Sequence, residues 1–176
     1  MREERTEVLV VGAGPVGLLT AILLAESGIE VRIIDREERT TARSYACALH
    51  PRTLKLLDRM GLAAPIIARG RRIEKIAFYD GASRQAEVNL ARLGGPFPFM
   101  VILPQNDFES VLEQRLRQAG ATVSWNHRFN DVQNDAGMVA ATVEELGGTA
   151  TGYIVPHWET IVKQSFPLRA QFLVGA

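Results

Sequence analysis

The sequence has 176 residues, which is enough for one ordinary domain with a sizeable core. Hydrophobic residues make up 47% of it and charged residues 23%, a balance that is normal for a globular protein and excludes a disordered chain. Twenty basic and twenty acidic residues cancel, and no basic stripe is present, so we expect no nucleic-acid partner.

Cys47 is the only cysteine, so the chain can form no internal disulfide, and we expect a buried thiol and a cytoplasmic location. No run of about twenty unbroken apolar residues is present, so no membrane span is predicted. Glycines interrupt the apolar run at 8–25 and glutamates precede it, which argues against a secretory leader. His50, His127 and His157 lack metal-ligand spacing, so no metal site is predicted.

The first 35 residues predict a strand, a helix and a second strand. Residues 8–11 are a continuous aliphatic run, typical of a strand buried in a parallel sheet. Pro15 suits the first position of a helix and Gly28 its end. The second strand, 29–34, ends at Asp35, and the whole is a βαβ unit. The apolar face of the helix is predicted at Val16, Leu19, Ile22, Leu23 and Leu24.

Farther along, the pattern is a mixture of loops, short helices and strands. Residues 36–49 are polar and predict a loop, and Asp80-Gly81 predicts a turn between two strands. Asn106 or Asp107 is expected to cap a helix that ends at Gly120. The other predicted elements are helical segments at 50–61 and 65–69, strands at 73–81, 85–93, 99–103, 121–125 and 138–146, and a final buried strand at 170–176, with no clean period over 147–170.

The glycine-rich turn after the first strand, GAGPVG, fits the dinucleotide-binding pattern G-x-G-x-x-G. Gly12 permits the sharp turn, Gly14 lets a pyrophosphate approach the backbone, and Gly17 lets helix and strand pack closely. Phosphate oxygens would meet unpaired N–H groups and the favourable dipole at the helix N-terminus, so Pro15 and Val16 belong to the predicted cofactor-binding residues.

Asp35 supports the same interpretation. It lies eighteen residues beyond Gly17, close to the spacing expected for a carboxylate that binds an adenosine ribose. Its charge also disfavours a 2′-phosphate by repulsion. A βαβ turn without any ligand is the structural alternative. The motif therefore predicts an adenine dinucleotide but does not distinguish FAD from NAD.

Four segments together resemble the FAD-dependent aromatic hydroxylases, the single-component flavoprotein monooxygenases of the para-hydroxybenzoate and phenol hydroxylase type. They are VLVVGAGPVGLLTAILLAESGIEVRIIDRE, RSYACALHPRTLKLLDRMGL, LPQNDFESVLEQRLRQAGATV and QFLVGA, in the family's order. The first is shared with many flavoproteins, whereas its combination with the next two is more specific. The resemblance implies an α/β fold: a Rossmann-like FAD/NAD(P)-binding domain with a parallel sheet at 1–72 and 104–176, and inserted strands of an incomplete substrate-binding sheet at 73–103.

The resemblance also implies roles for particular residues. FAD would be the cofactor and NAD(P)H a transient co-substrate, with the three glycines around the diphosphate and Asp35, with Arg36 beside it, at the adenosine ribose. Arg43 matches an arginine along the phosphates and ribityl chain, the alternative being a solvated loop charge. Gln105 matches a glutamine that hydrogen-bonds near the flavin end, the alternative being a helix cap. No side chain is assigned a catalytic role.

In the family, NAD(P)H reduces FAD and O₂ then hydroxylates an activated aromatic ring, chemistry that the cofactor carries. The family's last strand continues into Asp-Gly, whereas this sequence ends at Ala176. We therefore expect the FAD-binding part of a hydroxylase for a phenolic or polyketide-like substrate, incomplete as an enzyme alone. Two alternatives stay open: a non-catalytic module that pairs with itself or another chain through uncovered sheet surface, and a small NAD-dependent oxidoreductase. Substrate identity, NADH against NADPH, and oligomeric state also stay open.

Overall fold

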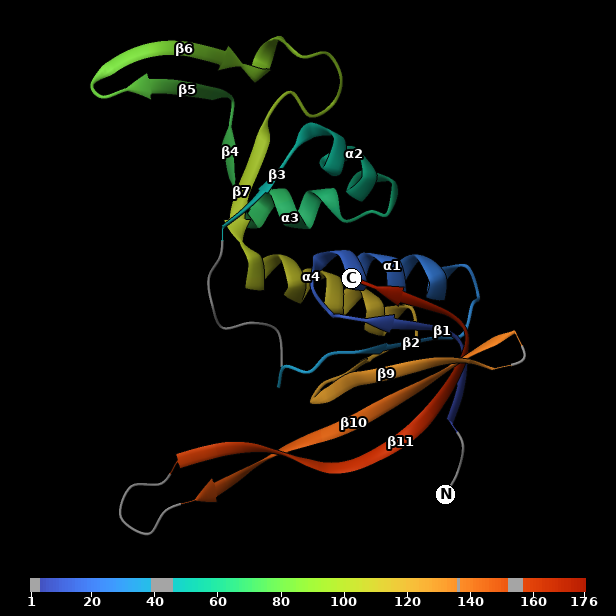
Figure 1. The fold of residues 1–176 in the computed structure, drawn as a ribbon. Helices are drawn as coiled ribbons and strands as arrows, with labels where there is room; N and C mark the ends of the chain where they lie inside the picture. Colours follow the sequence, from blue (N-terminus) through green and yellow to red (C-terminus); the bar gives the residue numbers. More distant parts are fainter. Residues whose placement is uncertain (1–3, 39–45, 136, 152–156) are drawn as a thin grey trace. The chain divides into compact units, whose positions relative to one another are not determined.

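The computed structural model describes residues 4–38, 46–135, 137–151 and 157–176. The chain forms two compact units, one of residues 1–41 and 112–176 and the other of residues 42–111 (Figure 1). In the described part of the chain, no helix is long and apolar enough to cross a membrane.

The first unit begins with the predicted βαβ unit. β1 (Glu4–Val11) and β2 (Val31–Ile34) pair in parallel, and α1 (Pro15–Glu26) connects them. Pro15 is the first helical residue, where its missing N–H is not needed. Gly28 follows the helix with a φ of +78°, a left-handed conformation that glycine adopts without strain. The strand, helix and strand are therefore confirmed, with β2 starting two residues later than predicted.

Six strands form the sheet of this unit, in the order β8–β2–β1–β11–β10–β9 (Figure 1). β8 (Val123–Ser124), β2, β1 and β11 (His157–Gly175) run parallel. β10 (Met138–Thr151) pairs antiparallel with both β11 and β9 (His127–Asp135). The predicted α/β class with a parallel sheet is confirmed. Within the stretch 147–170, which shows no clean period in the sequence, residues 147–151 of β10 pair antiparallel with residues 157–161 of β11.

The buried face of α1 differs from the predicted face. The helix packs on β1 and β2 and buries Leu18, Ala21 and Ile22 completely. Val16 and Leu23 were expected on that face, but they are 67% and 44% exposed. Nearly every residue of α1 is apolar, so the helical period alone could not select the face that packs on the sheet.

A cluster on the sheet joins its parallel and antiparallel parts. Leu9 of β1 and Ile34 of β2 are fully buried and belong to one cluster with Val143 of β10 and with Phe166 and Leu168 of β11. This packing anchors the ends of β1 and β2, after which the glycine turn and Asp35 follow.

The final strand is only partly buried, which corrects the prediction for residues 170–176. Ala170 is fully buried, but Phe172 is 65% exposed. The pairing of β10 with β11 stops at Ala170, so the residues beyond it have a neighbouring strand only on the β1 side. Phe172 and Val8 line an open apolar groove of about 470 Å³ together with Thr20 and Leu24 of α1.

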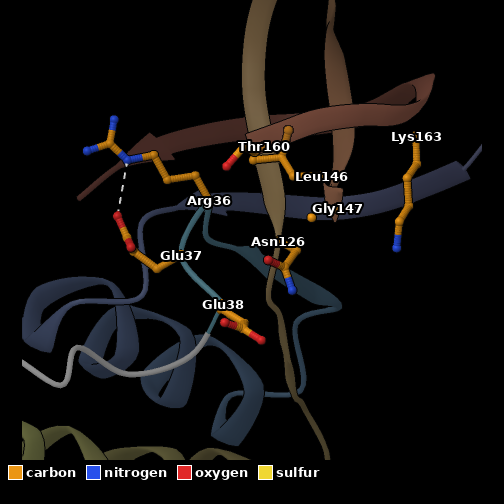
Figure 2. Close-up of a pocket in the computed structure, with 9 residues that line it drawn as sticks. Arg36, Glu37, Glu38, Asn126, Leu146, Gly147, Thr160 and Lys163 are labelled. Carbon is orange, nitrogen blue, oxygen red and sulfur yellow. Dashed lines mark ion pairs between the residues drawn. The ribbon is translucent and has the colours of Figure 1, made fainter. Parts of the chain in front are cut away.

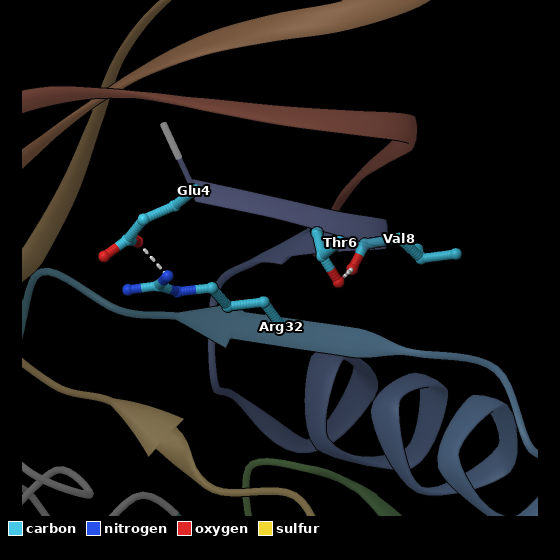
Figure 3. Close-up of polar contacts among 4 residues, drawn as sticks. All are labelled: Glu4, Thr6, Val8 and Arg32. Carbon is cyan, nitrogen blue, oxygen red and sulfur yellow. Dashed lines mark hydrogen bonds and ion pairs between the residues drawn. The ribbon is translucent and has the colours of Figure 1, made fainter. Parts of the chain in front are cut away.

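Polar contacts fix β1 against the start of β2 (Figure 3). The Arg32 guanidinium pairs with the Glu4 carboxylate across the two strands. The Thr6 hydroxyl donates to the carbonyl oxygen of Glu30 at 2.9 Å and lies 3.4 Å from that of Val8. Thr6 is only 7% exposed, so its hydroxyl needs these acceptors inside the protein.

The second unit holds a three-stranded antiparallel sheet in the order β3–β7–β4, with two helices. The loop prediction for residues 36–49 is wrong over the last four, because pairing with β7 makes them a strand whatever their local composition. The two helical segments are confirmed. The elements are β3 (Ala46–Leu49), α2 (Pro51–Arg59), α3 (Ala63–Arg69), β4 (Arg71–Ile73) and β7 (Met100–Pro104).

A separate hairpin in this unit consists of β5 (Lys75–Asp80) and β6 (Ser83–Asn89), and the short 3₁₀ helix η1 (Leu90–Arg92) follows it. The turn lies at the predicted place, where Gly81 has a φ of +56°. Most of the hairpin is exposed, including the aromatic side chain of Phe78.

Helix α4 (Gln105–Gln118) starts directly after Pro104, the last residue of β7. Asn106 and Asp107 therefore lie inside its first turn, and the prediction that one of them caps the helix is wrong. Asp107 still suits this end, because a negative charge is favourable near the positive end of the helix dipole. The predicted end is confirmed at Gly120, which has a φ of +88°.

Candidate functional site

The chain turns sharply between β1 and α1, and two glycines make this turn possible. Gly12 has a φ of +107°, which side-chain-bearing residues rarely adopt, and its N–H donates to the carbonyl of Ile34 at 2.9 Å. A Cβ on Gly12 would collide with the carbonyl of Ala176. A Cβ on Gly17 would collide with the carbonyl oxygen of Gly12, so the close approach of helix and strand requires glycine there.

The N-terminus of α1 is open toward this turn. Gly14 is its N-cap residue, no side chain caps the helix, and its first turn carries no acidic residue. Leu18 makes the first helical hydrogen bond, to the Gly14 carbonyl, so the N–H groups of Val16 and Gly17 have no acceptor in the helix. A Cβ on Gly14 would meet no heavy atom within 4 Å. The space beside the backbone is therefore free, and the arrangement fits an anionic group such as a diphosphate.

The Asp35 carboxylate ties the end of β2 to the glycine turn. Its Oδ2 accepts a hydrogen bond from the N–H of Ala13 at 2.6 Å, and its Oδ1 accepts one from the N–H of Glu37 at 2.8 Å. The backbone N–H of Asp35 donates to the carbonyl oxygen of Ser124 at 3.0 Å, and its carbonyl oxygen accepts a hydrogen bond from the N–H of His127 at 2.8 Å. A carboxylate offers about four acceptor positions, so Asp35 keeps capacity for donors such as ribose hydroxyls.

An open cavity of about 490 Å³ lies beside Asp35 and Gly12. Residues 127–129 at the start of β9 form another wall. The Arg128 guanidinium is held by Glu144 of β10 at 2.6 Å, so this wall is braced by the antiparallel part of the sheet. The cavity brings together the glycine turn and the acid that follows β2, the two features that the sequence motif predicts.

A second cavity of about 680 Å³ shares Arg36 and Glu37 with the first (Figure 2). These two exposed side chains form an ion pair of 3.5 Å. Lys163 lies across Gly147, where a Cβ would collide with its methylene groups, and it has no ion-pair partner in the described part of the chain. The second cavity is thus polar and mixed in charge, and Arg36 borders both cavities.

The sequence reasoning missed the contribution of β9 and the turn before it. Asn126 has a φ of +58°. Its N–H donates to the carbonyl oxygen of Glu37 at 2.8 Å, and its carbonyl oxygen accepts a hydrogen bond from the N–H of Leu146 at 2.7 Å. An asparagine between two short strand-like segments was the available signal, because asparagine tolerates this conformation. His127 lines the first cavity, and its Nδ1 lies 2.7 Å from the Trp125 carbonyl oxygen. Among the described residues, no group of three or more His, Cys, Asp or Glu could hold a metal ion.

The other two predicted residues lie elsewhere in the chain. Arg43 falls outside the described residues. Gln105, in the second unit, is the first residue of α4, and its Nε2 donates to Oε1 of Glu109 at 2.7 Å. Its amide nitrogen thus bonds a side chain, not the backbone of the first turn. Cys47 is half-buried, and burial, then the charge of Glu109, raises the pKa of its thiol.

The family model for the FAD binding domain matches residues 5–176 of this sequence. The chain belongs to the FAD-binding domain family. One similar curated protein is the para-nitrophenol 4-monooxygenase of Pseudomonas sp. (strain WBC-3), 33% identical over 81% of this chain and 36% of the relative. Another is the pentachlorophenol 4-monooxygenase of Sphingobium chlorophenolicum, 31% identical over 86% of this chain and 28% of the relative. The 6-methylpretetramide 4-monooxygenase of Streptomyces rimosus is 36% identical over 71% and 23%.

Solved structures agree with this assignment. The crystal structure of a p-nitrophenol 4-monooxygenase from Pseudomonas putida DLL-E4 matches this FAD-binding domain with a TM-score of 0.84 and 28% identity, over 98% of this chain and 41% of the other. The resemblance to aromatic hydroxylases is therefore confirmed. The chain spans about a quarter to a third of the length of these curated relatives.

Proposed function

We propose that the first unit of this FAD-binding domain holds FAD, with the diphosphate at the glycine turn and the adenosine ribose at Asp35. One observation carries the proposal: an uncapped helix N-terminus with free space at Gly14 lies next to a carboxylate that bonds Ala13. Backbone N–H groups and the helix dipole favour the negative diphosphate, and a carboxylate accepts hydrogen bonds from ribose hydroxyls. The proposed cofactor-binding residues of this unit are Gly12, Gly14, Pro15, Val16, Gly17, Asp35 and Arg36.

The remaining residue roles extend this proposal. Arg36 would contact the adenosine end, because it borders the cavity beside Asp35. Arg43 and Gln105 would contact the ribityl chain and the flavin end, a role supported by the resemblance alone.

For the whole protein, we propose a flavin-dependent monooxygenase that hydroxylates a phenolic or polyketide-like aromatic compound with NAD(P)H and O₂, in the cytoplasm. The aromatic monooxygenases among the relatives support this activity. Bound FAD would supply the redox chemistry, while residues of this chain bind and orient it. Because the chain spans only part of its relatives, the substrate pocket is proposed to need further polypeptide.

The domain boundaries are part of the same proposal. Residues 1–72 and 104–176 would form the FAD-binding domain, and residues 73–103 would belong to a substrate-binding sheet. The exposed β5–β6 hairpin supports this role, because an isolated pair of strands is only marginally stable in water.

A second candidate is a binding module without catalysis of its own, completed by another polypeptide. The open groove at Phe172 supports it, since exposed apolar surface of this kind favours association. The match to the FAD binding domain argues against a small NAD-dependent oxidoreductase.

A titration of the purified chain with FAD tests the proposal. We expect a yellow complex with one FAD per chain and quenched flavin fluorescence, with NAD unable to compete at equal concentration. Failure to bind FAD, or preference for NAD, would overturn it. Addition of NADPH and a phenol then tests the need for further polypeptide: coupled hydroxylation by the chain alone would contradict it.

A further inference from the structure

Glu109 is the only charged side chain that is buried in the described part of the chain, with 3% of its surface exposed. The proposed function does not use it. Burying a carboxylate is unfavourable unless hydrogen-bonding partners replace its water. The buried Glu109 carboxylate on α4 therefore needs hydrogen-bond donors among the groups that it contacts.

One of these groups is Gln105, which lies four residues earlier and so on the same face of α4. The Nε2 of Gln105 donates to Oε1 of Glu109 at 2.7 Å, a short hydrogen bond to a charged acceptor. Both side chains lie within the second unit.

The chemistry of this pair sets the orientation of an amide. The oxygen and nitrogen of a glutamine amide are nearly equal in size, so shape alone does not decide which of them faces a neighbour. An ionised carboxylate can only accept hydrogen bonds. In the structure Gln105 turns its NH₂ group toward Glu109, which leaves its carbonyl oxygen and its second N–H for other partners.

Cys47 is a neighbouring group within reach of this carboxylate. Cys47 of β3 feels the negative charge, which, after burial, raises the pKa of its thiol. Cys47 pairs with Leu103 of β7, the strand that leads into α4. The carboxylate on α4 thus lies near Cys47 of β3, within the second unit.

We propose that Glu109 is a positioning residue for FAD, because it holds the Gln105 amide in the one orientation that presents a carbonyl acceptor to an N–H or O–H donor of the flavin or its ribityl chain. This inference rests on the proposed role of Gln105 in FAD binding. Glu109 contacts no cofactor atom in this scheme and acts only through Gln105.

A double-mutant cycle tests the inference. Gln105→Ala is expected to weaken FAD binding about tenfold, and Glu109→Gln about three- to tenfold, because a neutral amide at 109 lets either orientation of Gln105 form a hydrogen bond. The double variant should bind FAD no more weakly than Gln105→Ala alone. If the loss of FAD affinity in the double variant equals the product of the fold-losses in the two single variants, Glu109 acts independently of Gln105. That result would overturn the proposal.

A measurement without FAD distinguishes positioning from general stability. In the free protein, nuclear magnetic resonance should show one proton of the Gln105 side-chain amide exchanging slowly, and Glu109→Gln should remove that protection while leaving the melting temperature nearly unchanged. Rapid exchange of this amide in the unmutated protein would contradict the proposal even if a variant failed to fold.

Glu113→Gln is the matched control, because Glu113 is a carboxylate one turn farther along α4 that pairs with Arg117 at 2.5 Å. It should leave both FAD affinity and Gln105 exchange unchanged. Loss of affinity in this control would assign the effect to helix charge and overturn the role of Glu109. If the unmutated chain binds no FAD, the proposed function itself fails. If it binds FAD and Gln105→Ala binds equally well, the role of Gln105 and the present inference fail, while FAD binding by the first unit stands.

Discussion

The Asp35 carboxylate accepts a hydrogen bond of 2.6 Å from the backbone N–H of Ala13, inside the glycine turn. Its second oxygen accepts one of 2.8 Å from the N–H of Glu37. Asp35, at the end of β2, therefore stabilises the turn through these hydrogen bonds, and it is also the proposed acceptor for the ribose hydroxyls. The turn keeps its shape for a diphosphate partly because Asp35 holds it.

Replacement of Asp35 should accordingly affect both stability and cofactor binding. We expect Asp35→Ala to lower the free energy of unfolding of the FAD-free protein by about 1–3 kcal/mol. FAD binding should become weaker by about the same amount, the usual range for losing hydrogen bonds to a charged group. Calorimetric titration and chemical unfolding measure the two quantities. Glu38→Ala is the control, because this neighbouring acid is exposed and should change neither. An unchanged FAD affinity in Asp35→Ala would remove Asp35 from the site.

The two later glycines of the turn should respond differently to alanine. In Gly17→Ala the new Cβ would collide with the Gly12 carbonyl oxygen, so we expect a loss of about 1–3 kcal/mol in unfolding free energy. In Gly14→Ala the Cβ meets nothing and the φ of −69° suits alanine, so stability should fall by less than about 1 kcal/mol.

The same pair of variants separates packing from binding. Gly14→Ala should still weaken FAD binding at least about tenfold, or about 1.4 kcal/mol, because the methyl group occupies the space proposed for the diphosphate. Thermal unfolding and fluorescence titration of both variants provide the comparison. Tight FAD binding by Gly14→Ala would place the diphosphate elsewhere.

Local chemistry explains why the βαβ unit could be predicted. Pro15 and Gly28 mark the ends of α1 through their own backbone preferences, and the aliphatic run before Gly12 can only be a buried strand. By contrast, β3 and β9 exist because β7 and β10 pair with them, and residues of that kind carry no strong local signal.

The candidate site divides in the same way. The spacing of Asp35 from the glycines follows from the length of one helix and one strand, so it could be read from the sequence. The bond from Ala13 to Asp35 and the wall formed by residues 127–129 depend on contacts between distant segments. The exposure of Val16 also escaped prediction, because an apolar residue on an almost wholly apolar helix gives no sign of which way it faces.

The Cys47 thiol should make stability depend on alkaline pH. Burial and the charge of Glu109 raise its pKa above the ordinary value of 9.0. The folded protein thus holds the thiol proton more firmly than the unfolded chain. The contribution of the protonated thiol to the free energy of unfolding is fully present below the thiol pKa of the unfolded chain. It is lost as the pH rises through the thiol pKa of the folded protein. Unfolding free energies at neutral pH and at about pH 10 should therefore differ more for the unmutated protein than for Cys47→Ala. Equal differences would show that the thiol is not perturbed.

Phe172 offers a test of the apolar groove beside α1. If this surface causes self-association, the molar mass measured by light scattering should rise with concentration for the unmutated chain and stay at one chain for Phe172→Asp. The substitution should cost less than about 1 kcal/mol of unfolding free energy, because Phe172 is already 65% exposed. Val132→Asp is the matched control, since Val132 is 44% exposed on β9, outside the groove, and should associate like the unmutated chain. A constant monomer mass for the unmutated chain would rule out the groove as a site of self-association, because its largest exposed side chain would then attract no second copy.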